Sequence, residues 1–236
     1  EFSSLEFRDV TFQYEEDEFP MVTNLSFSVN DGEFVSVIGA SGCGKSTLFR
    51  LINGLEKPQS GEILVNGVSI EKQKNYSSFM PQKDLLLPWR TIEKNVCLPM
   101  EIMKVPKTEQ EEKCREALKQ VGLIDYIDKY PKDLSGGMKQ RVAFARTLLA
   151  GADMLLLDEP SLGLAPIIVG EVFDTIRRIR DEGITVILVE QNAKKSLSIC
   201  DYAYVLENGR MVKSGPGRQM LDDPDIAAAY LGVREE

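Results

Sequence analysis

The 236-residue chain contains no histidine, which removes the side chain that most often carries protons near neutral pH. Cysteine is scarce as well. The four cysteines are scattered and form no CxxC pair, so we expect reduced thiols and no cysteine metal site. No apolar run reaches the roughly 20 residues that a membrane-spanning helix needs. We also expect no secretory signal.

Positive charge is in short supply too. The chain has 28 Lys and Arg residues against 37 Asp and Glu residues, for a formal net charge of −9. This balance argues against a general nucleic-acid binder, so we expect no nucleic-acid partner. The length suits one large domain, or a core with an inserted subdomain, and is sufficient to bury a real core.

The most informative stretch is residues 39–47, GASGCGKST, which match the P-loop pattern G-x-x-x-x-G-K-[ST]. An apolar run at residues 34–38 predicts a buried strand before it, and the spacing of residues 48–53 suits a helix after it. Lys45 can reach the β- and γ-phosphates, and the Ser46 hydroxyl is placed to bind Mg²⁺. A flexible Gly/Ser loop is the alternative. The predicted nucleotide-binding residues are Gly39, Ser41, Gly42, Cys43, Gly44, Lys45, Ser46 and Thr47.

Two adjacent carboxylates end another apolar run, at residues 154–157. A strand of an α/β fold that ends in acids places them at the edge of the sheet where ligands bind. We therefore expect Asp158 to hold Mg²⁺ and Glu159 to orient and polarise an attacking water. A strand-terminating acidic turn before Pro160 is the alternative interpretation.

Residues 134–141, LSGGMKQR, place a serine cap and two glycines before a helix, which makes a second N-terminal anion site. A simple helix-capping loop is the alternative. One triphosphate site does not need two such helix ends, so the second is expected to serve a neighbouring subunit's nucleotide. Tyr14, just past the first predicted strand, is a candidate platform for adenine stacking, with an ordinary turn aromatic as the alternative.

Periodicity places the remaining elements. A helix over residues 108–121 is expected to begin with Thr108 as N-cap and Glu111 completing a capping box. Other predicted helices cover residues 45–53, 91–103 and 166–182. The predicted strands cover residues 5–12, 25–29, 34–38, 61–67, 76–80, 154–157, 184–189, 203–207 and 210–213.

Together these motifs resemble the ATP-binding cassette (ABC) transporter ATPases over residues 5–231. The resemblance implies an α/β P-loop NTPase with a RecA-like core of mostly parallel sheet, an antiparallel β-subdomain and an inserted helical subdomain. Residues of about 5–88 and 151–231 would form the core, and about 89–150 the helical subdomain. It further implies ATP and Mg²⁺ as cofactors, an ATP-dependent homo- or heterodimer, a membrane permease as partner, and a cytoplasmic location on the inner face of the cell membrane.

The resemblance also implies roles for individual residues. The turn of Ser135, Gly136 and Gly137 would meet the partner's γ-phosphate. Gln82 would contact Mg²⁺ and link the core to the helical subdomain, and residues 83–89 would lie near the groove that receives a permease helix.

Two positions depart from the family's common pattern. Gln191 stands where a switch histidine is usual, and Ala165 stands where an aspartate is usual. Glutamine can donate a hydrogen bond to a γ-phosphate, but it does not titrate. With Glu159 and Lys45, Gln191 completes the expected catalytic set.

The two halves of the chain resemble different importer groups. Residues 80–90 are similar to ATPases of nitrate, sulfonate, taurine and pyrimidine-precursor importers, whereas residues 161–166 and 189–192 are similar to those of branched-chain amino-acid importers. We hypothesise a mosaic or engineered fusion of two ABC ATPase halves. The leading function is an ATPase that powers small-molecule import.

Two other classes of function compete with this reading. One is an ATP-binding dimer or scaffold with little or no hydrolysis. The other is a soluble cassette protein acting on DNA repair or ribosomes. That class usually has tandem cassettes or long coiled-coil insertions, and this sequence has neither.

Overall fold

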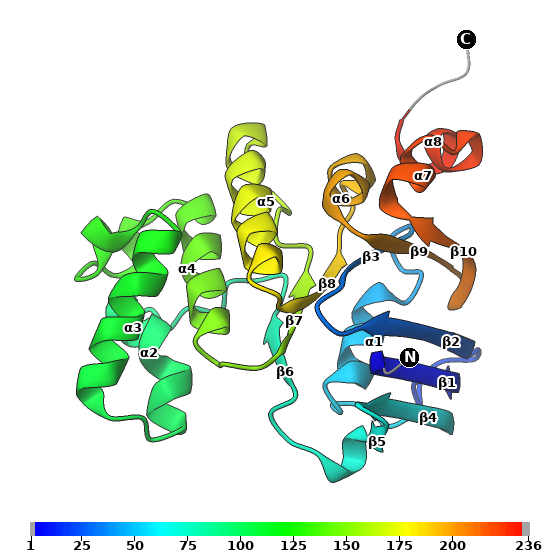
Figure 1. The fold of residues 1–236 in the computed structure, drawn as a ribbon, viewed down its shortest axis with the longest axis horizontal. Coiled ribbons are helices and arrows are strands. Elements are labelled where there is room, and N and C mark those ends of the chain that lie inside the picture. Colours follow the sequence, from blue (N-terminus) through cyan, green and yellow to red (C-terminus); the bar gives the residue numbers. More distant parts are fainter. Residues whose placement is uncertain (1–2, 233–236) are drawn as a thin grey trace.

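The structure, a computed structural model, describes residues 3–232. A six-stranded sheet forms its centre, in the order β10-β9-β3-β8-β7-β6 (Figure 1). Strands β9, β3, β8, β7 and β6 run parallel, and β10 pairs antiparallel with β9. The strands are β3 (Phe34–Ile38), β6 (Ser77–Met80), β7 (Met154–Asp158), β8 (Thr185–Val189), β9 (Tyr202–Glu207) and β10 (Arg210–Pro216).

Every residue of β3, β7 and β8 is buried. Their side chains alternate between two hydrophobic cores, as the period of two in a strand requires. In β8, for example, Val186 and Leu188 belong to one core and Ile187 to the other. This burial on both faces explains why the strands read as continuous apolar runs.

A second, antiparallel sheet packs beside the first. Its order is β2-β1-β4-β5, from β1 (Ser3–Phe12), β2 (Val22–Asn30), β4 (Ser60–Val65) and β5 (Val68–Ser69). Helix α1 (Lys45–Ile52) shares a core with this sheet and with the adjacent face of the central sheet, and Phe49 is among its fully buried side chains. The start of α1 is therefore held against both sheets.

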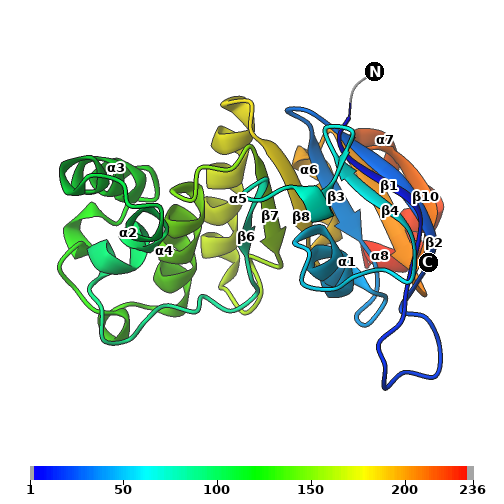
Figure 2. The ribbon, with the colours of Figure 1, turned by 90° about the horizontal axis from the view of Figure 1, so that it is seen from below.

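The remaining helices cover the other face and one end of the central sheet. The core that contains Val186 also receives side chains from α5 (Pro166–Asp181), α6 (Ala193–Ile199), α7 (Gly217–Leu221) and α8 (Pro224–Tyr230). Figures 1 and 2 show α2 (Ile92–Ile102), α3 (Lys107–Gln120) and α4 (Gly136–Leu148) together at the end beyond β6 and α5. Short 3₁₀ turns cover Ile70–Lys72, Ile124–Tyr126 and Pro131–Asp133. In the part of the chain that the structure describes, no helix is both long and apolar enough to cross a membrane.

The predicted cap of the second helix in this group is wrong. Helix α3 begins at Lys107, with Pro106 as N-cap and no side-chain cap bond. Proline fixes φ near the value that a chain entering a helix needs, and here φ is −55°. The helix thus starts before Thr108, which lies inside the first turn and forms no capping box with Glu111.

Candidate nucleotide site

The P-loop, residues 39–47, connects β3 to α1. Its last glycine before the helix, Gly44, has a φ of 105° and is the N-cap of α1, so no side chain occupies the end of the helix. Free N–H groups at a helix N-terminus attract anions. The first glycine has no room for a side chain, because a Cβ on Gly39 would lie 2.4 Å from the carbonyl oxygen of Leu206. The loop is therefore shaped by backbone packing.

Three predicted P-loop side chains have distinct surroundings. Lys45 is only 5% exposed, and its amine donates hydrogen bonds to the carbonyl oxygens of Gly39 and Ala40, the latter at 3.0 Å. The amine therefore lies against the loop. Cys43 is buried in the core shared by the two sheets, and burial raises the pKa of its thiol. Its side chain faces the protein interior, so only its backbone is available to a phosphate. Ser41 is exposed.

The acid pair, Asp158 and Glu159, lies where β7 ends, and each residue is 7% exposed. Burial, and then the neighbouring charge of Glu159, raise the pKa of Asp158 to about 6, while a hydrogen bond from Ser46 and the charge of Lys45 act in the opposite direction. The Ser46–Asp158 contact brings together the P-loop and the acid pair. The sequence predicted this meeting from the edge of the sheet alone.

The raised pKa of Asp158 leads to a prediction about stability. The folded state binds this proton more tightly than the unfolded state does, so the ionised carboxylate costs stability above pH 6, and this cost disappears as the pH falls towards 4. We expect Asp158→Asn to raise the unfolding free energy of the nucleotide-free protein by about 2 kcal/mol at pH 7. The gain should shrink at pH 5.

Urea unfolding at pH 7 and pH 5 measures this effect. The exposed Asp153, which precedes the same strand, provides the control: Asp153→Asn should change stability little at either pH. An Asp158→Asn variant that is no more stable than the parent at pH 7 would contradict the electrostatic account.

Glu159 has a φ of 44°, which is uncommon for a residue with a side chain. Its N–H donates to the carbonyl of Val189 at 2.8 Å, and its carboxylate accepts a 2.5 Å hydrogen bond from the side-chain amide of Gln82. The backbone oxygen of Gln82 accepts from Gln140 of α4 at 3.0 Å. Gln82 therefore touches both the acid pair and α4, the helix whose start carries the signature turn, residues 135–137. Its predicted contact with Mg²⁺ stays a prediction.

Tyr14 lies beside the start of α1. Its hydroxyl is 3.1 Å from the hydroxyl of Thr47, and its ring meets Phe12 edge-on with centroids 4.7 Å apart. The residue is half-buried. This position is compatible with the predicted stacking of a base.

The signature turn is separate from the P-loop within one chain. Ser135 caps α4, accepting from the N–H of Met138 at 3.3 Å, and both Ser135 and Gly136 are exposed. Gly137 packs so closely that a Cβ would lie 2.6 Å from Ile168. Figures 1 and 2 both show α4 and α1 on opposite sides of β7. The structure therefore does not place this turn beside the chain's own P-loop.

The predicted switch residue, Gln191, follows β8 and is exposed. Together with Glu159 it lines a hollow of about 300 Å³, to which Glu190 and Lys195 also contribute. Glu190 was not among the predicted site residues. It accepts three hydrogen bonds, and burial raises its pKa. An acid directly after a continuous apolar run was the only sequence signal for it, and that signal gave no partner.

Ala165, the other unusual position, is the N-cap of α5 and makes no side-chain cap bond. We expect Ala165→Asp to stabilise the protein by about 1 kcal/mol, because aspartate would accept a hydrogen bond from the first turn of the helix. Thermal unfolding can measure the change, with Ala165→Leu as a control that adds volume without an acceptor. Equal melting temperatures for the two variants would show that capping is not the missing interaction.

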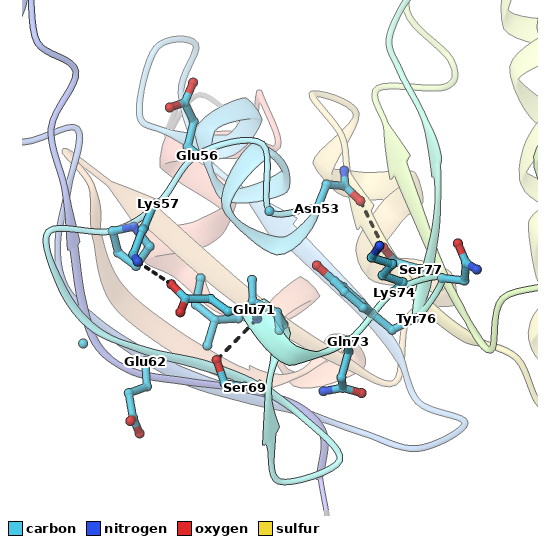
Figure 3. A pocket seen from close by; sticks show the side chains of 16 residues that line it. Asn53, Glu56, Lys57, Glu62, Ser69, Glu71, Gln73, Lys74, Tyr76 and Ser77 are labelled. Carbon is cyan, nitrogen blue, oxygen red and sulfur yellow. Dashed lines mark hydrogen bonds and ion pairs between the residues drawn. The ribbon is translucent and has the colours of Figure 1, made fainter.

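A separate hollow of about 820 Å³ lies between the end of α1 and the β4–β5 hairpin (Figure 3). Two polar pairs line it: Lys57 pairs with Glu71 at 2.9 Å, and Ser77 donates to Asn53 at 3.0 Å. The Nδ2 of Asn53 is buried without a hydrogen-bond partner. Tyr76 lies along one side. Among the residues that the structure describes, none of the P-loop, acid pair or signature turn lines this hollow. We assign it no part in nucleotide chemistry.

Comparison with known families and curated proteins gives concordant matches. The family described as "ABC transporter" matches residues 22–162. A methionine import ATP-binding protein MetN of Caulobacter vibrioides is 36% identical over 97% of this chain and 72% of its own length. MetN of Carboxydothermus hydrogenoformans is 37% identical over 82% of the chain and 60% of its length. The chain thus spans about two thirds of the length of these relatives.

Solved structures with similar folds include CbiO1 of Clostridium perfringens, part of an ABC transporter complex. It matches with a TM-score of 0.87 at 28% identity, covering 96% of this chain and 93% of that one. A dimeric ATP-binding cassette in a post-hydrolysis state, bound to ADP and Pi, matches with a TM-score of 0.81 at 27% identity, covering 91% and 99%. The likeness extends over nearly the whole of each chain.

Proposed function

Because the chain belongs to the ABC transporter family, we propose that it is the ATP-hydrolysing subunit that powers import of a small molecule through a membrane permease. As a member of this family it is an ATPase that uses ATP and Mg²⁺. The observation that carries the proposal is the contact of the P-loop with the acid pair, while the signature turn faces solvent on the far side of β7.

The residues present fit a magnesium ion. Mg²⁺ prefers oxygen ligands, and the Ser46 hydroxyl lies against the buried Asp158 carboxylate. Burial and the charge of Glu159 disfavour the ionised form of Asp158, and a bound cation would offset that cost. We propose that Ser46 and Asp158 hold the ion, with Gln82 beside them. When bound, Mg²⁺ neutralises charge on the β- and γ-phosphate oxygens.

Different residues of the chain bind the phosphates, polarise the attacking water and donate to the γ-phosphate. The N–H groups of the P-loop and the amine of Lys45 bind the phosphates and stabilise the charge that develops on them. Glu159 accepts a hydrogen bond from Gln82, which orients the carboxylate to polarise the attacking water. Gln191, on the hollow shared with Glu159, donates a hydrogen bond towards the γ-phosphate.

The proposed assembly is a head-to-tail dimer in which each signature turn completes the partner's nucleotide site. The exposure of Ser135 and Gly136 supports this, as does the dimeric cassette among the structural relatives. An exposed apolar pair, Leu85 at 60% and Trp89 at 73%, is proposed as the contact for the permease. The subunit would then act at the cytoplasmic face of the membrane.

The mosaic interpretation gains no support from the comparisons. Methionine import proteins align through both halves of the chain, up to 97% of its length. The similarity to these import proteins supports the proposed function without a fusion.

Steady-state phosphate release by the purified chain tests the proposed activity. We expect release that requires both ATP and Mg²⁺ and ceases when a chelator removes the metal. ATP binding without phosphate release would contradict the proposal and favour the scaffold alternative, to which the departures at Gln191 and Ala165 point.

A further inference from the structure

A single buried carboxylate joins the two loops that border the proposed reaction centre. Glu190 is 2% exposed and lies directly after β8. One of its oxygens accepts hydrogen bonds from the backbone N–H and the hydroxyl of Ser161, at 3.0 and 2.6 Å. Its other oxygen accepts from the N–H of Asn192 at 3.2 Å. Ser161 belongs to the loop after the acid pair, and Asn192 to the loop that carries Gln191.

All three partners of this carboxylate are donors. A carboxylate accepts hydrogen bonds through both oxygens, whereas an amide of the same shape would present one N–H₂ group to these donors. Burying a carboxylate costs free energy of folding unless its oxygens accept hydrogen bonds, and here both oxygens of Glu190 do so. The position therefore requires glutamate itself.

The two loops gain their relative placement from this residue. Asn192 is anchored on both sides, since its N–H binds Glu190 and its side-chain oxygen accepts from the N–H of Lys195 at 3.2 Å. Gln191 lies between these anchored residues. On the other loop, Ser161 is two residues from Glu159, whose carbonyl accepts from Leu162 at 3.0 Å. Glu190 thus fixes the backbone on either side of the hollow that Glu159 and Gln191 share.

We propose that Glu190 is a positioning residue for ATP hydrolysis, which holds the loop of Glu159 and the loop of Gln191 in one fixed arrangement. This proposal rests on the proposed function, because that function makes the shared hollow the reaction centre. Because the chain has no histidine, the proposed donor to the γ-phosphate is the uncharged side chain of Gln191. Its hydrogen bond to the phosphate depends on how accurately the loop positions it.

The test compares Glu190→Gln with the parent chain in steady-state kinetics. We expect kcat to fall at least tenfold while the KM for ATP and the equilibrium affinity for ATP change less than twofold. Ser161→Ala should reduce kcat in the same way, and Ser161→Thr, which keeps the hydroxyl, should restore it. In the double variant Glu190→Gln with Ser161→Ala the two losses should be less than additive, because both substitutions weaken the same bridge between the loops.

Amide hydrogen exchange separates this proposal from the proposed function. In the nucleotide-free protein, the N–H groups of Ser161 and Asn192 should be protected. In Glu190→Gln, the one of these two N–H groups that is left facing the amide N–H₂ should exchange at least tenfold faster. If the parent chain released no phosphate, the proposed function would fail, and the loss of protection would still test the bridge. Unchanged protection in Glu190→Gln, or an unchanged kcat in an active parent, would overturn the role of Glu190. A fall in kcat, ATP affinity and folded fraction together would overturn it too.

Discussion

Glu159→Gln is expected to lower ATP turnover at least a hundredfold while ATP affinity stays within about twofold of the parent. The substitution removes the proposed base for the attacking water but keeps the shape of the side chain. In the parent chain, Gln82 donates to the Glu159 carboxylate at 2.5 Å. The amide oxygen of the variant can still accept this hydrogen bond. The P-loop is untouched by the change.

Phosphate release and a fluorescent-ATP titration together measure this effect. Glu62→Gln provides a matched control, because Glu62 is an exposed carboxylate on the antiparallel sheet and should leave both quantities unchanged. Undiminished turnover in Glu159→Gln would remove its assigned role. A parallel loss of ATP binding would mean that the carboxylate maintains the site rather than acting on water.

Gly39→Ala is expected to reduce ATP affinity at least tenfold and to destabilise the protein by about 2 kcal/mol. The new Cβ would lie 2.4 Å from the carbonyl oxygen of Leu206 and 2.7 Å from the sulfur of Cys43. The nearer obstacle is backbone in β9, so the P-loop itself must move. Its N–H groups would then no longer converge on the phosphates.

The matched control for this substitution is Gly170→Ala, in helix α5. The nearest atom that an added Cβ would meet there is the amine of Lys195 at 3.7 Å, an ordinary contact. This variant should keep its ATP affinity and gain stability, because alanine favours a helix interior by up to about 1 kcal/mol over glycine. Isothermal titration and thermal unfolding of both variants give the comparison. Normal ATP affinity in Gly39→Ala would contradict the packing account.

The elements that the sequence predicted best are those with strong local signals. The apolar runs at residues 34–38 and 184–189 predicted buried strands correctly, because strands covered on both faces are mostly apolar. The serine cap at Ser135 also formed as expected. The predicted cap at Thr108 is wrong because the helix begins one residue before it, directly after Pro106. Two nearby residues both favoured a helix start, and the sequence did not show which of them would be the N-cap.

The contacts that could not be predicted from the sequence are those between residues far apart in the chain. Gln82 and Glu159 are 77 residues apart, and Glu190 and Ser161 are 29 apart. Their meeting depends on the order of strands in the sheet, where β7 lies between β6 and β8. The motifs predicted which residues carry chemistry, whereas the strand order determines which of them touch.

ATP-dependent dimerisation of the Glu159→Gln variant, measured by light scattering, tests the central claim most directly. If each chain presents its P-loop and its signature turn as separate half-sites, ATP should convert monomers into dimers. Ser135→Arg, which places a bulky cation on the exposed turn, should abolish this dimer while single-chain ATP binding persists. A variant that binds ATP yet remains monomeric, or a dimer indifferent to Ser135→Arg, would contradict the account.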